Sequence, residues 1–189
     1  MQTPLTPDQL IDLLIDADPL CDLPRTGWLL RGVPSPESLA AHSWAVAIVA
    51  DFLADLLKAD GETIDSEKVL RMALLHDLAE ARTGDIPMPN KNGRVSEAIH
   101  TLEATIISEM LPTSHAALWA EAEAGKTLES RVVKAADKIQ MMIKVLIYEK
   151  RRGANLDEFW KNPKNFRDMD LVRATEIYDA IRKRKRGEC

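Results

Sequence analysis

Two adjacent polar residues, His76 and Asp77, interrupt an apolar helical run that extends from Val69 to Glu80. On a helix, Glu80 lies four residues after His76 and three after Asp77, so the three side chains can face one point. An unpaired buried carboxylate is costly, so Asp77 should be paired or bound to a metal. The doublet alone is short enough to recur by chance, and its meaning depends on what the rest of the chain provides.

Two distant residues interrupt apolar helical stripes in the same way. His42 follows helical spacing with Val46, and Asp137 does so with Val133. Two imidazoles and two carboxylates from different helices form a plausible nitrogen and oxygen site for one divalent ion, namely Mn, Co, Fe, Ni, Zn or Mg. The expected metal ligands are His42, His76, Asp77 and Asp137.

Each of these residues also has a purely structural interpretation. A lone histidine on an apolar stripe is usually a hydrogen-bonded core residue. Asp137 can pair with Lys134 or Lys138, and Glu80 can be a surface carboxylate near Arg82. The joint occurrence of the four candidates, in this order, favours the metal site over these alternatives.

The ordered set resembles the H…HD…D signature of the HD-domain phosphohydrolases. Segments 25–31 (RTGWLLR), 36–38 (PES) and 76–87 (HDLAEARTGDIP) look like the HD-domain 5′-deoxynucleotidases in particular. That subgroup carries a tryptophan ahead of the first histidine and an HDxxE…GD continuation after the doublet. The likeness covers about residues 25–150, which is most of the chain.

The resemblance implies roles for two further carboxylates. Glu80 would orient and deprotonate the attacking water, as its position one turn beyond His76 also suggests. Asp85 would lie near the scissile phosphate or the substrate sugar, although an aspartate after a glycine is often only a turn former.

The substrate-binding residues are expected around Trp28. The resemblance implies that Trp28 orients the phosphate, whereas a tryptophan in such a loop is most often an apolar lid over the core. Arg25 and Arg31 flank it, and a guanidinium fork matches phosphate oxygens, although both can equally be structural. Glu121 is the last candidate, because the family places polar residues of this region within reach of substrate.

The function that the resemblance implies is metal-dependent hydrolysis of deoxyribonucleoside 5′-monophosphates to deoxynucleoside and phosphate. One alternative keeps the site but changes the substrate to a cyclic nucleotide or an alarmone. Another is a non-catalytic helical module that binds metal and nucleotide. The family often forms homodimers, and the apolar content of the last helices would permit one.

Composition agrees with a compact enzyme. With 189 residues, 46% hydrophobic and 29% charged, the chain is most simply one domain spanning 1–189. The net charge of −5 argues against nucleic-acid binding, and the basic run 182–186 suits a solvated helix end. Two cysteines without a CxxC, no signal segment and no apolar run long enough to span a membrane predict a cytoplasmic protein.

Helical periodicity and breaker residues predict an all-α bundle of the HD-domain type. The expected helices cover about residues 7–17, 36–58, 66–82, 96–110, 114–124, 128–151 and 167–184. Residues 23–33 are expected to form a loop. The motif-bearing core would then span about 25–150, followed by a C-terminal helix and basic tail at about 167–189.

Overall fold

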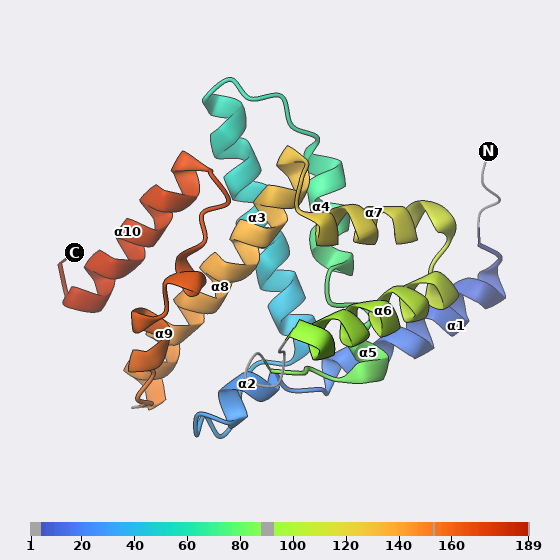
Figure 1. Ribbon diagram of the computed structural model, residues 1–189, viewed down its shortest axis with the longest axis horizontal. Helices are drawn as coiled ribbons and strands as arrows, with labels where there is room; N and C mark the ends of the chain where they lie inside the picture. The colour runs from blue at the N-terminus through green and yellow to red at the C-terminus, as the bar shows by residue number, and fades with distance from the viewer. Residues whose placement is uncertain (1–4, 88–92, 153, 189) are drawn as a thin grey trace.

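The computed structural model describes residues 5–87, 93–152 and 154–188, and within these ranges the protein is all-α. The elements are α1 (Pro7–Ala17), η1 (Asp18–Cys21), α2 (Thr26–Leu29), α3 (Leu39–Ala59), α4 (Ser66–Leu75), α5 (Glu80–Thr83), α6 (Gly93–Met110), α7 (Thr113–Ala124), α8 (Leu128–Arg152), α9 (Asp157–Lys161), η3 (Pro163–Phe166) and α10 (Val172–Arg186) (Figure 1). The predicted fold class is confirmed.

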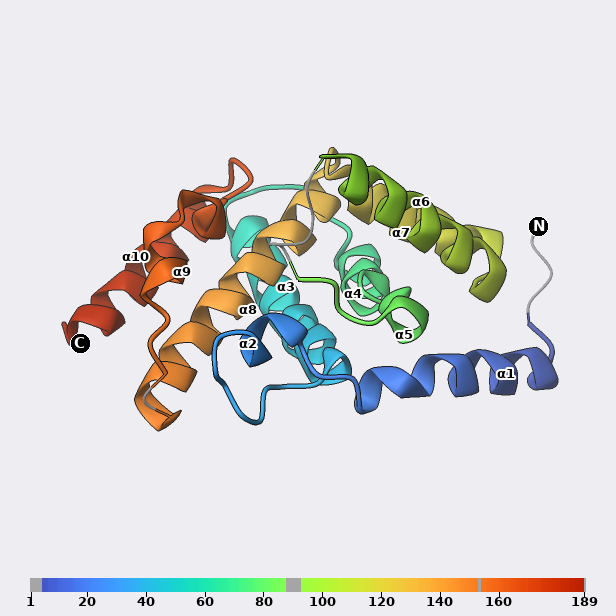
Figure 2. The same ribbon diagram turned by 60° about the horizontal axis from the view of Figure 1, so that its bottom comes forward.

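Helix α3 occupies the centre of the bundle and packs against α4 and α8 (Figure 1). Its buried face includes Val46, Ala50, Leu53 and Ala54, whose relative exposure is 0%. The alanines keep that face narrow, so neighbouring helices approach closely and remove apolar surface from water. Helices α1 and α10 lie at opposite ends of the molecule (Figure 2).

Helix α3 is also, by length and composition alone, the one described helix that could cross a membrane. The sequence expectation concerned an uninterrupted apolar run, and α3 is interrupted by Asp51 and Asp55. In the structure, 44% of the apolar window is buried within the protein. Together with its packing against α4 and α8, this burial explains its apolar character as that of a core helix.

Side-chain caps fix where several helices begin. Thr6 and Gln9 form a reciprocal capping box at α1. Asp65 accepts from the backbone N–H of Lys68 at 3.0 Å and begins α4. Ser38 caps α3, so this helix begins at Leu39 rather than near Ser35–Glu37 as expected.

The helix expected over residues 66–82 is interrupted at the doublet. Helix α4 ends at Leu75, residues 76–79 form a turn, and α5 begins at Glu80. The backbone here makes tighter i to i−3 bonds, such as Glu80 N–H to Asp77 O at 3.0 Å. The imidazole of His76 approaches the Ala73 carbonyl at 2.7 Å, where a regular helix would place a backbone donor. One continuous helix therefore does not present the doublet and Glu80.

Two other expectations about local structure were wrong. The segment predicted as a loop at 23–33 contains the short helix α2. The last helix begins at Val172 rather than near Arg167, because α9, η3 and a turn precede it. These short elements lie beside the site and form part of it.

Candidate metal centre and active site

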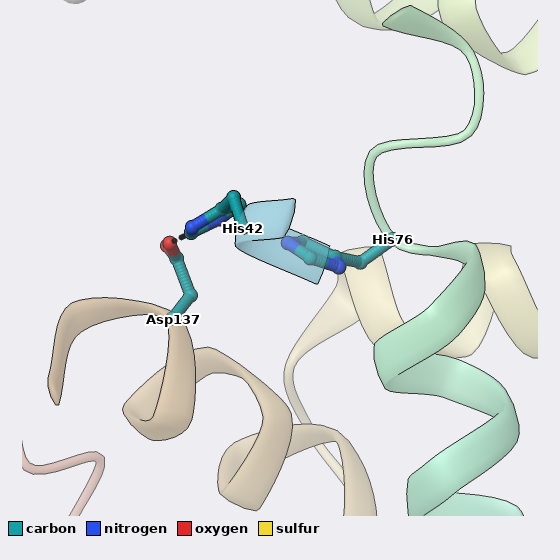
Figure 3. Close-up of side chains that lie close together, drawn as sticks. All are labelled: His42, His76 and Asp137. Atoms are coloured by element: carbon teal, nitrogen blue, oxygen red, sulfur yellow. Dashed lines mark ion pairs between the residues drawn. The ribbon is translucent and has the colours of Figure 1, made fainter. Parts of the chain in front are cut away.

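Three helical elements bring the predicted metal ligands together. His42 comes from the first turn of α3, His76 from the turn after α4, and Asp137 from the middle of α8 (Figure 3). One ligand atom from each lies within 4.8 Å of the others. His42 Nε2 is 3.3 Å from Asp137 Oδ1 (Figure 3).

Asp77 completes the cluster from the same turn as His76. Its Oδ2 lies 3.2 Å from His76 Nε2 and 3.5 Å from His42 Nε2. The same oxygen accepts a hydrogen bond from Arg25 Nη1 at 3.3 Å. The structure therefore places Asp77 beside His42 and His76, while the three residues whose ligand atoms all lie within 4.8 Å of one another are His42, His76 and Asp137.

The chemistry of this donor set fits a divalent metal ion. The Nε2 atoms of His42 and His76 are buried, and within the described part of the chain neither makes a hydrogen bond. Buried polar atoms normally have partners, and each of these nitrogens instead faces carboxylate oxygen. Imidazole nitrogen combined with carboxylate oxygen is a common ligand set for divalent metals.

The electrostatic field at the cluster favours a cation. Burial alone would lower the pKa of His76, but the carboxylates of Asp77 and Asp137 raise it to about 9. Burial would raise the pKa of Asp77, yet the neighbouring His76, His42 and Arg25 hold it well below its usual range. A site that binds a proton this strongly also attracts a metal ion, which competes for the same lone pair.

Asp137 pairs with one of the two lysines that its sequence position suggested and also faces the cluster. Its Oδ2 accepts from Lys138 Nζ at 2.9 Å, while Oδ1 faces His42. Burial would raise the pKa of Asp137, but Lys138 and His42 lower it well below the ordinary value. The carboxylate is therefore ionised and offers one oxygen to the cluster.

A cavity of about 440 Å³ opens over the cluster. Its floor includes Asp77 and Asp137, and Arg25 and Trp28 also line it. Glu80 is buried at the start of α5 and lines the cavity as well. A volume of this size is typical of small-molecule sites.

Asp85 reaches the cavity because of the glycine before it. Gly84 has φ of 70°, a left-handed conformation that ends α5 and turns the chain. Asp85 Oδ2 then accepts from the backbone N–H of Gly27 at 3.3 Å, which ties this loop to α2. Asp85 therefore lines the cavity, and its side chain is bonded to α2 rather than to the backbone of its own turn.

Trp28 forms an aromatic cluster at the edge of the cavity. Its ring stacks on Phe159 with centroids 5.0 Å apart and meets Tyr148 edge-on at 5.2 Å. The side chain is buried, and its Nε1 has no hydrogen-bond partner among the described residues. Trp28 is thus a packed lid, as the structural interpretation held, and also a cavity residue.

Both flanking arginines line the cavity, but in different settings. Arg25 is close to the floor, where its guanidinium forms an ion pair with Asp77. Arg31 lies farther out, pairs with Glu158 of α9, and places its guanidinium 5.0 Å from the centre of the Phe159 ring. Arg25 can therefore reach an anion at the metal, whereas Arg31 joins α2 to α9.

Glu121 is not brought to this cavity. It lies near the end of α7, where its carboxylate pairs with Lys68 at 2.7 Å and accepts from Thr127 at 2.6 Å. The Lys68 ammonium beside it holds the pKa of Glu121 below its ordinary value. The structure thus gives Glu121 a bracing position between helices.

One wall of the cavity was not predicted from the sequence. This wall comes from α9, η3 and the residue after η3, and its cavity-lining members are Glu158, Phe159, Asn162, Lys164, Asn165 and Arg167. The segment lacks helical periodicity over any useful length. A mixture of aromatic, amide and basic residues (FWKNPKNFR, 159–167) was the available signal.

Comparison with known proteins agrees with this geometry. Residues 17–173 match the HD domain family model. The chain is 36% identical over 141 residues to 5′-deoxynucleotidase HDDC2 of Dictyostelium discoideum, covering 68% of this chain and 72% of that protein. A conserved hypothetical protein from Pyrococcus furiosus superposes with a TM-score of 0.81 at 37% identity, covering 92% of this chain and 99% of its own.

A more distant structure shares the fold. The HD phosphohydrolase DatZ of cyanophage S-2L, solved with dA and one catalytic Zn²⁺ ion, has a TM-score of 0.61 at 22% identity, and the match covers 97% of this chain and 99% of that one. Ordered histidine and aspartate ligands, their convergence on one point, and the family match together lead to one conclusion: this chain belongs to the HD-domain family of metal-dependent phosphohydrolases.

Proposed function

We propose that this chain acts as one HD-type domain that hydrolyses deoxyribonucleoside 5′-monophosphates to deoxynucleoside and phosphate with one divalent metal ion. The observation that carries the proposal is the clustering of His42, His76, Asp77 and Asp137 at a cavity that is lined by the two aspartates and also by Glu80 and Arg25. The relative from Dictyostelium discoideum is named a 5′-deoxynucleotidase, which supports this choice of substrate.

The charges around the cavity suit a phosphate monoester. Among the described residues that line it, five are basic and five are acidic, so their formal charges cancel. A divalent cation at the floor would leave an excess of two positive charges. A phosphate monoester carries about −1.5 to −2 at neutral pH, which nearly matches this excess.

The residues around the metal have separable roles. A bound divalent ion lowers the pKa of a water molecule from about 15.7 toward about 7 and polarises a phosphoryl oxygen. Glu80 accepts the proton of the attacking water, and its buried position keeps it near the reacting atoms. Arg25 stabilises charge on the phosphoryl oxygens from its place beside Asp77.

Two further residues position the substrate. Asp85 orients the phosphate or protonates the leaving 5′ oxygen, and its bond to Gly27 fixes its direction. Trp28 closes the cavity beside the phosphate, and its buried indole N–H can donate to a phosphate oxygen. Discrimination against ribonucleotides requires a packed surface beside the second carbon of the sugar, where a hydroxyl would not fit.

Phosphate release from a panel of nucleoside monophosphates tests the proposal. The panel includes deoxy and ribo forms with 5′ or 3′ phosphates, assayed after chelation with and without Mn²⁺ or Co²⁺. Metal-dependent release confined to 5′-deoxynucleotides is expected. Silence across the panel with metal bound would overturn the nucleotidase assignment, and the assay would then extend to cyclic nucleotides and alarmones.

We also propose that the protein is a cytoplasmic homodimer. Helix α3 exposes a stripe of apolar side chains at one-turn spacing, namely Trp44, Ile48, Phe52 and Leu56. Trp44 and Phe52 are 66% and 64% exposed, which is unusual for such large rings. A two-fold axis across this stripe would bury the same face of both copies, as symmetric dimers do.

Light scattering coupled to gel filtration tests the dimer. The parent protein should elute with twice the chain mass, and a Trp44→Lys/Phe52→Lys variant should elute as a monomer. Val172→Lys is the matched control, because Val172 is 75% exposed on α10 and outside the stripe. A monomeric parent protein would contradict the proposal.

A further inference from the structure

The Nδ1 atom of His42, which points away from the carboxylates, makes a buried contact with Gln140, a residue outside the proposed mechanism. His42 Nδ1 lies 2.8 Å from Oε1 of Gln140, and the relative exposures of these two residues are 0% and 3%. Gln140 lies on α8, three residues after Asp137. Because Gln140 contacts Nδ1 while Nε2 faces the carboxylates, Gln140 lies behind His42 as seen from the cluster.

The orientation of the Gln140 amide is set by its other neighbour. Gln140 Nε2 donates to Glu37 Oε2 at 2.9 Å, and Lys144 Nζ pairs with the same oxygen at 3.1 Å. An ionised carboxylate has no hydrogen to donate, so the amide nitrogen must face Glu37. The amide oxygen must then face His42.

This orientation decides the tautomer of His42. An amide oxygen only accepts hydrogen bonds, so the proton of the neutral imidazole resides on Nδ1. Nε2 is then left with its lone pair toward Asp137 and Asp77, which is the form that binds a metal. The polar side chains of Lys144, Glu37 and Gln140 therefore form a chain of contacts that fixes the tautomer of His42.

The Nδ1 atom of His76 also faces a hydrogen-bond acceptor, but this acceptor belongs to the backbone. The atom lies 2.7 Å from the backbone carbonyl oxygen of Ala73, which also accepts only. Every residue type at position 73 would supply that carbonyl. The support of His42 instead comes from side chains and can be removed by substitution.

We propose that Gln140 is a positioning residue that holds His42 in its metal-binding tautomer, with Glu37 and Lys144 fixing the direction of the amide. The proposal rests on the metal site of the proposed function but on no particular substrate. Partners behind metal-bound histidines orient the ring and set its tautomer, and their loss typically reduces metal affinity by about 10–100-fold.

The direct test replaces Gln140 by methionine, which has similar length but no strong acceptor. Co²⁺ is titrated into the chelated protein, and its visible absorption reports both affinity and geometry. We expect Gln140→Met to weaken Co²⁺ binding by about 10–100-fold. In the metal-free protein, ring ¹⁵N shifts should show His42 losing its uniform Nδ1–H form, and only four histidines contribute to that spectrum.

Two companion variants separate positioning from packing. Met142→Leu changes a fully buried residue of the same helix at nearly constant volume, and it should leave Co²⁺ affinity unchanged. The exchange Glu37→Gln/Gln140→Glu reverses amide and carboxylate, so that an acceptor still faces His42 and the net charge is conserved. This double variant should recover most of the affinity that Gln140→Met loses.

The outcomes decide the proposal independently of the nucleotidase assignment. Unchanged Co²⁺ affinity and an unchanged His42 tautomer in Gln140→Met would overturn it. An exchange variant that folds but binds Co²⁺ as poorly as Gln140→Met would also count against it. Absence of phosphate release from every nucleotide would affect only the proposed function, because affinity and ¹⁵N shifts need no substrate.

Discussion

The floor and the wall of the cavity are built in different ways. The floor is formed by Asp77 and Asp137 and is backed by His42 and His76, and these residues come from α3, α8 and the turn after α4. The wall consists of α2, α9 and η3, each only four or five residues long. Isolated helices of that length are unstable, so the wall depends on tertiary contacts, both between its members and with Tyr148 of α8.

Those contacts join segments that are far apart in sequence. Arg31, two residues after α2, pairs with Glu158 of α9, and Trp28 of α2 stacks on Phe159. A partly exposed ion pair contributes less than about 1 kcal/mol, and an aromatic pair about 0.5–1.5 kcal/mol. The wall is therefore weakly fixed compared with a floor embedded in the helical core. This difference suits a site in which the metal must stay while substrates enter and leave.

Removal of a floor ligand should have the largest effect. In His76→Ala the metal affinity should fall by more than about 100-fold, which is the upper end of the loss expected when only a hydrogen-bond partner of a ligand is removed. Turnover should disappear. Co²⁺ titration and phosphate release measure both. His115→Ala is the control, because His115 lies on α7 and its Nδ1 lies 3.2 Å from the Ser114 hydroxyl oxygen. Retained metal and turnover in His76→Ala would show that the cluster is structural.

Substitution of Glu80 tests whether proton acceptance can be separated from metal binding at the floor. Glu80→Gln should lower kcat by about 10²–10⁴-fold while KM and Co²⁺ affinity change little, since the amide keeps the shape but cannot accept the proton. Steady-state kinetics with saturating metal measures this. A loss of Co²⁺ binding equal to the loss of activity would instead make Glu80 a ligand.

Arg31 tests the wall. Arg31→Met removes the pair with Glu158 and one cavity cation, so KM should rise about tenfold with kcat nearly unchanged. Arg71→Met is the matched control, because Arg71 forms an exposed ion pair with Glu67 within α4. A fall in kcat without a change in KM would mean that the wall acts on the chemical step.

The same division explains what the sequence could predict. His42 and Asp137 stand out because long helices have a regular apolar stripe that a polar residue visibly interrupts. Phe159 and Asn162 stand in no such stripe, because their elements are too short to show helical periodicity. Tertiary contacts with α2, such as the stacking of Phe159 on Trp28, place this segment at the cavity. The break at His76 was also hidden, since it involves a side chain that approaches the Ala73 carbonyl. Local pattern therefore finds ligands on long helices and misses contacts made between distant segments.

Glu121 should give the smallest effect and marks the outer limit of the site. Its bonds to Lys68 and Thr127 brace α7 against α4, and it is absent from the described cavity lining. Glu121→Ala should therefore leave kcat, KM and Co²⁺ affinity unchanged and lower the free energy of unfolding by less than about 1 kcal/mol. Urea denaturation and nucleotide kinetics measure the two sides. A clear rise in KM would restore the substrate-binding role that the family resemblance suggested, and would mean that substrate extends beyond the cavity toward α7.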